Sequence, residues 1–206
     1  MYQKLKILVK KKIIYNIASP ILSKIRTLKN KHEGETCYLF GDGASIKYFD
    51  LSSFSDKITL SLCYIPFHKD FKYLNCRYAF QTFPYFFYPK PTTFYTTNGL
   101  QKIYRKFINQ SRDINFFVNL SNYPVLWNSN IFYLFDKIQD DESAFLRDCY
   151  LNNINIFKGV FCYSISLAIY MGFKEIILLG CDYTNKITLH RHWYEKGEGK
   201  LKIIPD

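Results

Sequence analysis

The sequence contains no apolar run of about 20 residues, the length that a membrane-spanning helix needs. Its N-terminal stretch IIYNIASPIL is broken by Asn16, Ser19 and Pro20, and is therefore a poor signal-peptide core. We expect a cytoplasmic protein, in which any contact with the inner face of a membrane is peripheral.

Cysteine pairs are also lacking. The six cysteines show neither a Cys-x-x-Cys pair nor the Cys/His spacing of a zinc site. Four of them, Cys37, Cys63, Cys162 and Cys181, lie in apolar runs, which predicts buried free thiols in a reducing compartment.

Acidic residues are absent from residues 1–32, which carry nine of the 28 Lys and Arg residues. Across residues 33–206 the other 19 basic residues face 17 acidic ones, so the body of the chain is nearly neutral. A nucleic-acid-binding protein would more often spread positive charge around its site, so no nucleic-acid partner is expected. The basic segment is either an amphipathic helix for an anionic membrane surface or a solvated helix packed on the body.

What the chain has in abundance is apolar and aromatic residues, at 48% and 19% of the composition, which argues against disorder. Its 206 residues predict one domain with a real core. We interpret residues 1–32 as a basic amphipathic leader, in which Pro20 interrupts a first helix. Residues 33–206 are then a single α/β nucleotide-binding domain, entered through a linker at HEGET and either complete or C-terminally truncated at Asp206.

Apolar runs typical of strands occur at residues 37–40, 57–63, 77–83, 113–120 and 175–180. The last run shows no alternation, as expected inside a parallel sheet that is covered on both faces. A buried helix is predicted at Val160–Met171, ended by Gly172 in the left-handed conformation. A helix followed by an apolar strand, after earlier strands, favours an α/β fold with a doubly wound, mostly parallel, Rossmann-like sheet.

Two glycines follow the first predicted strand, in GDGAS at residues 41–45. Ligands of open α/β sheets bind at the carboxyl ends of strands, where glycines let the backbone turn sharply and approach a phosphate. Ser45 can cap the following helix or donate to that phosphate. A tight turn without a ligand would use the same residues, and the dinucleotide pattern would need a third glycine at Ile46.

The segment GCDY ends the last predicted strand, and so projects Asp182 and Tyr183 from the same edge as GDGAS. His190 and His192 follow in LHRHWYEKG. A carboxylate and two imidazoles just past a strand end are suited to acid–base chemistry. Asp182 as a cap or turn residue, and the histidines as surface loop residues, are the simpler interpretations.

Together these segments resemble the family 42 sialyltransferases. They also resemble related bacterial surface-glycan proteins and 6-hydroxymethylpterin diphosphokinase-like proteins. The resemblance covers roughly residues 36–83 and 157–196. The matching residues are Gly41, Gly43, Ser45, Gly159, Val160, Ala168, Gly172, Phe173, Lys174, Glu175, Ile176, Leu178, Gly180, Asp182, His192, Trp193 and Tyr194.

The resemblance implies a fold of the GT-A-variant type. It also implies a metal-independent, inverting glycosyltransferase that uses a CMP-activated, sialic-acid-like sugar in surface glycan or lipopolysaccharide synthesis. No metal or other cofactor is expected, and the chain contains no Asp-x-Asp motif. The implied partners are the nucleotide-sugar donor and a glycan or lipid-linked acceptor.

The resemblance also implies roles for individual residues. His192 would be the general base, with His190 as second choice, and Asp182 would organise the site edge. Tyr183 and Tyr194 would hold the leaving phosphate. The nucleotide would lie against residues of three segments, namely Gly41, Asp42, Gly43, Ser45, Cys63, Gly159 and Val160.

Several positions depart from the family pattern. Asp42 and Ala44 stand where the first loop usually has Asn and Pro, and Cys63 or Tyr64 stands where an Asn touches the nucleotide. Thr184 stands where the sialyltransferases have a tyrosine. A carboxylate beside a phosphate is repulsive, so Asp42 would instead accept from a ribose hydroxyl or a base amine. Two alternatives therefore stay open, a non-catalytic Rossmann-like binding module and a pterin-type diphosphokinase that needs Mg²⁺.

Overall fold

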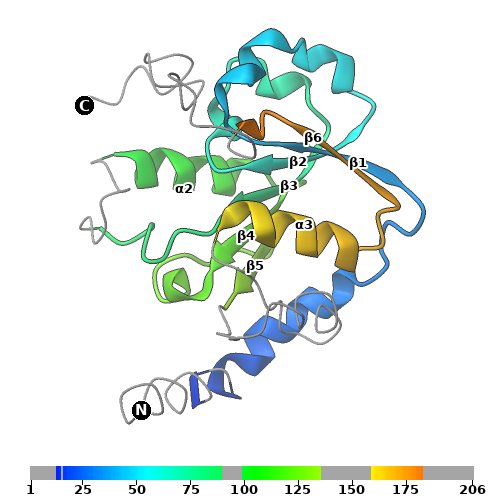
Figure 1. Ribbon diagram of the computed structural model, residues 1–206. Helices are drawn as coiled ribbons and strands as arrows, with labels where there is room; N and C mark the ends of the chain where they lie inside the picture. The colour runs from blue at the N-terminus through cyan, green and yellow to red at the C-terminus, as the bar shows by residue number, and fades with distance from the viewer. Residues whose placement is uncertain (1–12, 15, 90–98, 136–158, 183–206) are drawn as a thin grey trace, which may run out of the picture.

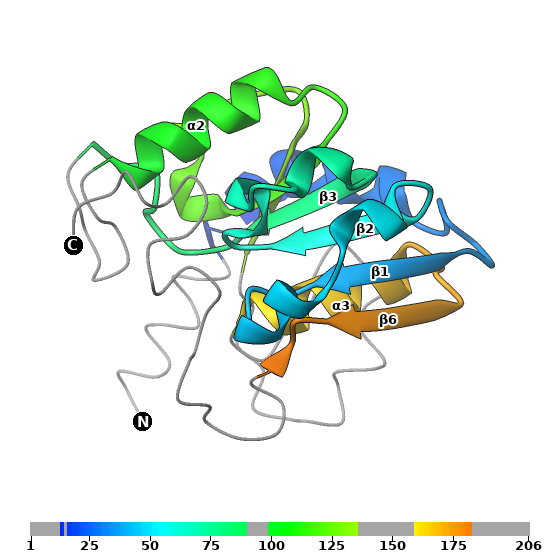
Figure 2. The same ribbon diagram turned by 90° about the horizontal axis from the view of Figure 1, so that it is seen from above.

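The computed structural model describes residues 13–14, 16–89, 99–135 and 159–182. Six strands form one sheet in the order β5-β4-β3-β2-β1-β6, and every neighbouring pair is parallel (Figures 1 and 2). The strands are β1 (Thr36–Phe40), β2 (Ile58–Leu62), β3 (Cys76–Gln81), β4 (Asn115–Asn119), β5 (Ile131–Leu134) and β6 (Glu175–Leu179). The predicted parallel α/β sheet of the Rossmann-like kind is confirmed, and it is parallel throughout.

Helices cover both faces of the sheet. Helix α2 (Leu100–Gln110) packs one apolar face against the side of the sheet that carries Phe40, Ala79 and Val118. Helix α3 (Val160–Tyr170) covers the side that carries Leu39, Leu60 and Phe80, as Figure 2 shows from above. Two buried faces explain why the central strands are apolar without alternation.

Gly172 ends α3 as predicted, with a φ of +86°. The N–H of Phe173 donates to the carbonyl of Ala168, and that of Gly172 donates to the carbonyl of Ile169, which is the Schellman arrangement. A Cβ on Gly172 would lie 3.2 Å from the Cα atoms of Asn30 and Glu33, so this glycine also admits a neighbouring turn.

That turn, Lys29–Glu35, includes most of the segment interpreted as a linker, and it is docked on the end of α3. The N–H groups of Asn30, His32 and Gly34 donate to the carbonyls of residues 170, 171 and 172. The His32 imidazole stacks on Phe173 with ring centroids 4.5 Å apart. Alternate amides of the turn thus satisfy carbonyls that the helix end leaves open.

One expectation is wrong: Pro20 does not interrupt the N-terminal helix. Residues 16–22 are α-helical and lead into the 3₁₀ helix η1 (Ser23–Leu28). A proline cannot donate to the carbonyl four residues before it, and here that carbonyl belongs to Asn16, an exposed residue. A proline on the solvent side therefore did not end the helix.

The burial of the N-terminal helical segment changes near Ala18. From there onward Ala18, Leu22, Ile25 and Leu28 are buried. Upstream, Ile13 and Ile17 are 54% and 76% exposed. None of the described helices combines the length and apolarity required to cross a membrane.

Lys24 ties η1 to the edge strand β5. Its Nζ donates to the carbonyls of Ser129 and, at 2.8 Å, Ile131, and it lies over the Phe132 ring. A lysine over an edge strand occupies backbone acceptors that would otherwise invite pairing with another chain. The basic segment is therefore part of the folded body in its second half.

Neither α2 nor β5 was among the predicted elements. The predicted runs at residues 37–40, 57–63, 77–83, 113–120 and 175–180 became β1, β2, β3, β4 and β6, with ends shifted by at most two residues.

Candidate functional site

The order of the strands reverses at β1. From β1 the chain proceeds through β2 to β5 in one direction, and β6 returns to the other side of β1 (Figure 2). GDGAS follows β1 and GCD follows β6, so both segments leave the sheet at this switch point. A crevice at the carboxyl ends of strands beside a switch point is where open α/β sheets bind ligands.

The two segments are joined by hydrogen bonds. The N–H of Gly41 donates to Leu179 O at 2.7 Å, and that of Gly43 donates to Gly180 O at 2.9 Å. Asp182 completes the connection, because its carboxylate accepts from the N–H of Ser45 at 2.8 Å and from the Ser45 hydroxyl. This carboxylate thereby satisfies an open N–H at the start of the 3₁₀ helix η2 (Ala44–Tyr48).

The glycines make this approach possible. A Cβ on Gly43 would lie 2.6 Å from both Asp182 Cγ and Gly180 O, and one on Gly41 would lie 2.5 Å from Gly180 O. Gly180 has a φ of +65°, and a Cβ there would meet the Ile46 side chain at 2.3 Å. The facing loop fills the space that a side chain at each of these positions would need. The close packing of the two loops therefore explains why these residues are glycines, and no ligand is required.

Asp42 and Cys63 lie at the same edge, after β1 and β2. Cys63 has a φ of +39° and is buried, and its N–H donates to Phe80 O at 2.9 Å. Burial, and secondarily the charge of Asp42, raises the pKa of the Cys63 thiol well above its usual value. Burial, and among other causes the charge of Asp42, also raises the pKa of the Tyr64 phenol. The same two causes contribute to the pKa of the Cys181 thiol, which rises to about 11.

Gly159 and Val160 begin α3. The C-terminal end of that helix is fixed to residues 30–34 before β1, at the amino edge of the sheet. Because 11 helical residues span about the length of a five-residue strand, the start of α3 reaches the carboxyl edge. Gly159 has a φ of +135°, and no atom lies within 4 Å of a Cβ built there.

The structure thus brings Gly41, Asp42, Gly43, Ser45, Cys63, Gly159, Val160 and Asp182 to one edge. Tyr183, His190, His192 and Tyr194 lie outside the described residues. The described residues contain no group of three or more His, Cys, Asp or Glu placed to hold a metal. Metal-independent chemistry, and the roles of all these residues, stay predictions.

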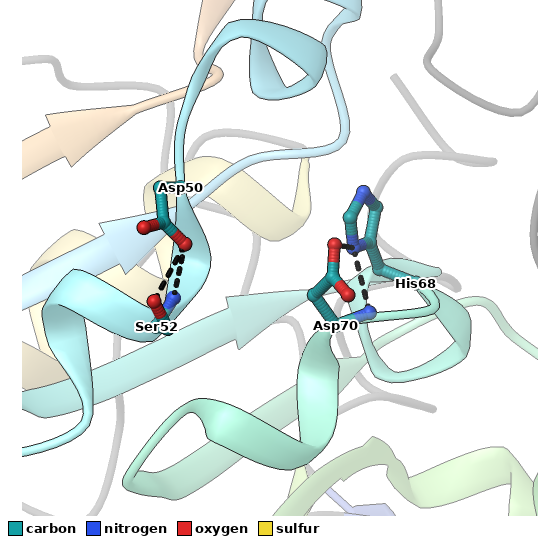
Figure 3. Close-up of polar contacts among 4 residues, drawn as sticks. All are labelled: Asp50, Ser52, His68 and Asp70. Atoms are coloured by element: carbon teal, nitrogen blue, oxygen red, sulfur yellow. Dashed lines mark hydrogen bonds and ion pairs between the residues drawn. The ribbon is translucent and has the colours of Figure 1, made fainter.

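The turns after β1 and β2 are organised by local caps (Figure 3). Asp50 accepts from the N–H and the hydroxyl of Ser52, at 3.0 and 2.7 Å. His68 Nδ1 accepts from the N–H of Asp70 at 3.2 Å and lies 4.0 Å from its carboxylate. His68 is buried, and this geometry indicates a turn-forming residue.

Gln81 and Tyr104 were not singled out in the sequence. Gln81 ends β3 at the carboxyl edge, is fully buried, and finds no hydrogen-bond partner among the described residues for either amide atom. The hydroxyl of Tyr104 in α2 is equally buried and has no partner in the described part of the chain. A glutamine at the end of the apolar run Tyr78–Phe80 was the available signal, since buried polar groups in proteins nearly always pair.

A cavity of about 370 Å³ lies at the opposite, amino edge of the sheet. Its lining includes His32, Glu35 and Tyr78. The His32 imidazole bridges the other two, with Nδ1 2.5 Å from a Glu35 carboxylate oxygen and Nε2 2.7 Å from the Tyr78 hydroxyl. These bonds hold the docked turn on the sheet.

Comparison of the chain with protein-family models, with curated proteins and with solved structures returned no match.

Proposed function

We propose that this protein binds a nucleotide-activated sugar at the carboxyl edge of its sheet and transfers the sugar to a surface-glycan acceptor. The observation that carries the proposal is the joining of GDGAS and GCD at the switch point of a parallel sheet. The sequence resemblance supplies the finer assignment, a metal-independent inverting transferase of the GT-A-variant type that uses a CMP-sugar.

The amide of Gln81, which has no hydrogen-bond partner among the described residues, supports a ligand at this edge. Leaving a buried donor and acceptor unpaired costs on the order of 1–3 kcal/mol for each group. A nucleobase edge, which offers a donor and an acceptor side by side, matches such an amide. In this proposal Asp42, which follows β1 at the same edge of the sheet, accepts from a ribose hydroxyl or an exocyclic amine.

The contact between Ser45 and Asp182 refines the proposed roles. The N–H and the hydroxyl of Ser45 donate to Asp182, so neither is directed to a phosphate in this state. Asp182 is then a residue that positions the loop. The proton transfer falls to His192, with His190 as second choice, because imidazole titrates near neutral pH.

The first test is thermal stability with CMP, CDP, UDP, GDP, ATP and AMP, each with and without Mg²⁺. A ligand at a hundred times its dissociation constant stabilises a protein by about 2.7 kcal/mol. Stabilisation by CMP without metal is the expected result. Stabilisation by ATP only with Mg²⁺ would favour the diphosphokinase instead, and no response to any nucleotide would overturn the transferase.

A Rossmann-like binding module without catalysis is the second candidate. It is favoured by the pairing of Ser45 with Asp182, which occupies two groups that a phosphate would otherwise engage. The two candidates differ in turnover. His192→Ala should abolish transfer and leave CMP binding unchanged in a transferase, whereas a binding module shows no transfer to abolish.

The acceptor is proposed to lie at the cytoplasmic face of an anionic membrane. Residues 1–32 lack acidic residues and carry nine basic ones, and the exposed Ile13 and Ile17 add apolar surface. Because Leu22 and Leu28 are buried, the test deletes residues 1–17 only. The shortened protein should keep its stability and lose binding to anionic vesicles, and retained binding would refute the membrane role.

A further inference from the structure

The loops that follow β3 and β4 leave the sheet at the same carboxyl edge as the candidate site. They comprise residues 83–88 and 120–127. Three of their aromatic side chains are exposed, whereas Phe86 and Phe87 beside them are buried. They are Tyr85, Tyr123 and Trp127, with exposed fractions of 49%, 38% and 72%.

Buried polar side chains hold the two loops together. Asn122, which is fully buried, accepts from the N–H of Phe87 at 2.9 Å and donates to Phe83 O at 3.1 Å. Arg105 of α2 donates to Phe87 O at 2.8 Å and to Val125 O at 2.5 Å. The loops therefore form one rigid surface that Arg105 ties to the middle of α2.

The exposed rings lie on this rigid surface. The Tyr123 and Trp127 rings have centroids 6.1 Å apart with planes inclined by 35°. The indole N–H of Trp127 donates to the carbonyl of Tyr123, so the one polar group of this exposed side chain is already engaged. Tyr85 lies on the adjoining loop, where its N–H donates to the hydroxyl of Ser121 at 2.8 Å.

Tyr85 also has a φ of +57°, a conformation that a bulky side chain adopts at a cost. The Ser121 bond and the buried Phe86 and Phe87 on its C-terminal side hold it there. The strained backbone conformation thus occurs at Tyr85, a residue whose aromatic ring is exposed.

Neither loop contains Lys, Arg, Asp or Glu within residues 83–88 and 120–127. A surface that binds the phosphates of a nucleic acid or a lipid headgroup would need cations. An uncharged aromatic surface instead matches a neutral sugar ring, whose C–H groups carry partial positive charge and stack on the negative face of an aromatic ring.

We propose that Tyr85, Tyr123 and Trp127, here called the aromatic platform, bind a neutral sugar ring of the acceptor glycan. That this glycan is the acceptor of a transfer reaction rests on the proposed function. The platform begins at the carboxyl edge, where the loops after β3 and β4 leave the sheet and where the proposed donor site lies, and it extends to Trp127 on the way to the start of β5.

The test uses the fluorescence of Trp127 in the full-length Trp193→Phe variant, because these are the only two tryptophans. The probes are neutral di- and trisaccharides that end in galactose, glucose or N-acetylglucosamine. At least one should quench or shift the emission saturably. Trp127→Ala should weaken binding of that sugar, measured by calorimetry, by about tenfold, and Trp127→Phe should restore most of it.

Tyr73→Ala is the matched control. Tyr73 is 46% exposed, in the 3₁₀ helix η5 (Phe71–Tyr73) that precedes β3 and so lies toward the other edge. Its removal should leave sugar binding unchanged. Equal loss in both variants, no response to any sugar, or quenching by a single-stranded oligonucleotide in place of sugars would each overturn the platform.

The outcomes also separate this proposal from the proposed function. If the protein transfers sugar, Trp127→Ala should raise the KM for acceptor and leave the KM for donor unchanged. Unchanged acceptor kinetics would refute the platform and leave the transferase standing. Sugar binding lost in Trp127→Ala, together with no nucleotide binding, would refute the transferase and leave the platform as a glycan-binding site.

Discussion

Ser45 and Asp182 lie 137 residues apart in the chain and form two hydrogen bonds to each other. Both bonds cross from the loop after β1 to the loop after β6. They fix the carboxyl ends of the two strands that flank the switch point.

Breaking this pair should cost stability that depends on both partners. Asp182→Ala leaves the Ser45 N–H and hydroxyl without their acceptor, and we expect a loss of about 1–3 kcal/mol in the free energy of unfolding. Ser45→Ala removes one bond and should cost less. Urea unfolding of the two single variants and the double variant should give a coupling energy of about 0.5–3 kcal/mol. Additive losses would show that the contact contributes nothing specific.

Gly43→Ala should destabilise the protein although its backbone is ordinary. Gly43 has a φ of −70°, which any residue adopts, yet a Cβ there would lie 2.6 Å from Gly180 O. Gly34 is the matched control, with a φ of +82° and open space around its Cβ. Gly34→Ala should cost about 1–2 kcal/mol from backbone strain alone, and Gly43→Ala should cost more. The reverse order in thermal unfolding would contradict the packing of the two loops.

The protein should lose stability at alkaline pH. Burial raises the pKa of Tyr78 to about 12, and burial likewise raises that of Tyr133 to about 12, from an ordinary 10.0. Because both folded-state values lie above the unfolded ones, their contribution is complete below about pH 10 and disappears as the pH rises through about 12. Unfolding free energies across this range should fall, and the fall should be shallower in Tyr78→Phe. Phenolate absorbance that rises fully near pH 10 in a still-folded protein would contradict the burial.

Thiol labelling should follow burial among the described cysteines. Burial raises the pKa of Cys37 to about 12 and that of Cys76 to about 11, so few thiolates form near neutral pH. Cys162 is partly exposed and its pKa is raised less. Peptide mapping after brief alkylation of the native protein should find Cys162 modified before Cys37 and Cys76. Equal rates for all three would indicate that the sheet opens readily.

Local chemistry in the sequence predicted much of the fold. The apolar runs at β1, β2, β3, β4 and β6 were identified because strands buried on both faces contain little else. The end of α3 was identified because Gly172 accepts a positive φ that other residues disfavour. The position of GDGAS and GCD at one edge followed from the rule that parallel strands end on the same side.

Other elements carried too little local signal. Strand β5 has only four residues, and α2 follows a stretch rich in Pro and Thr that reads as irregular. Pro20 was misread because its effect depends on which side of the helix faces water, and that side is set by the packing of Leu22 and Leu28 on the body. Gln81 became a candidate site residue only because the structure shows it fully buried, with no hydrogen-bond partner among the described residues.

The sequence by itself determined the parallel α/β architecture and the edge at which its polar loops gather, because both depend on patterns within short segments. Only the tertiary structure decided what those loops contact. The Gly43 hydrogen faces Asp182, the turn at His32 is docked on α3, and Asn122 joins two loops into one surface. Each of these contacts joins residues far apart in the chain, and no local pattern specifies the partner of a glycine, a histidine or an asparagine.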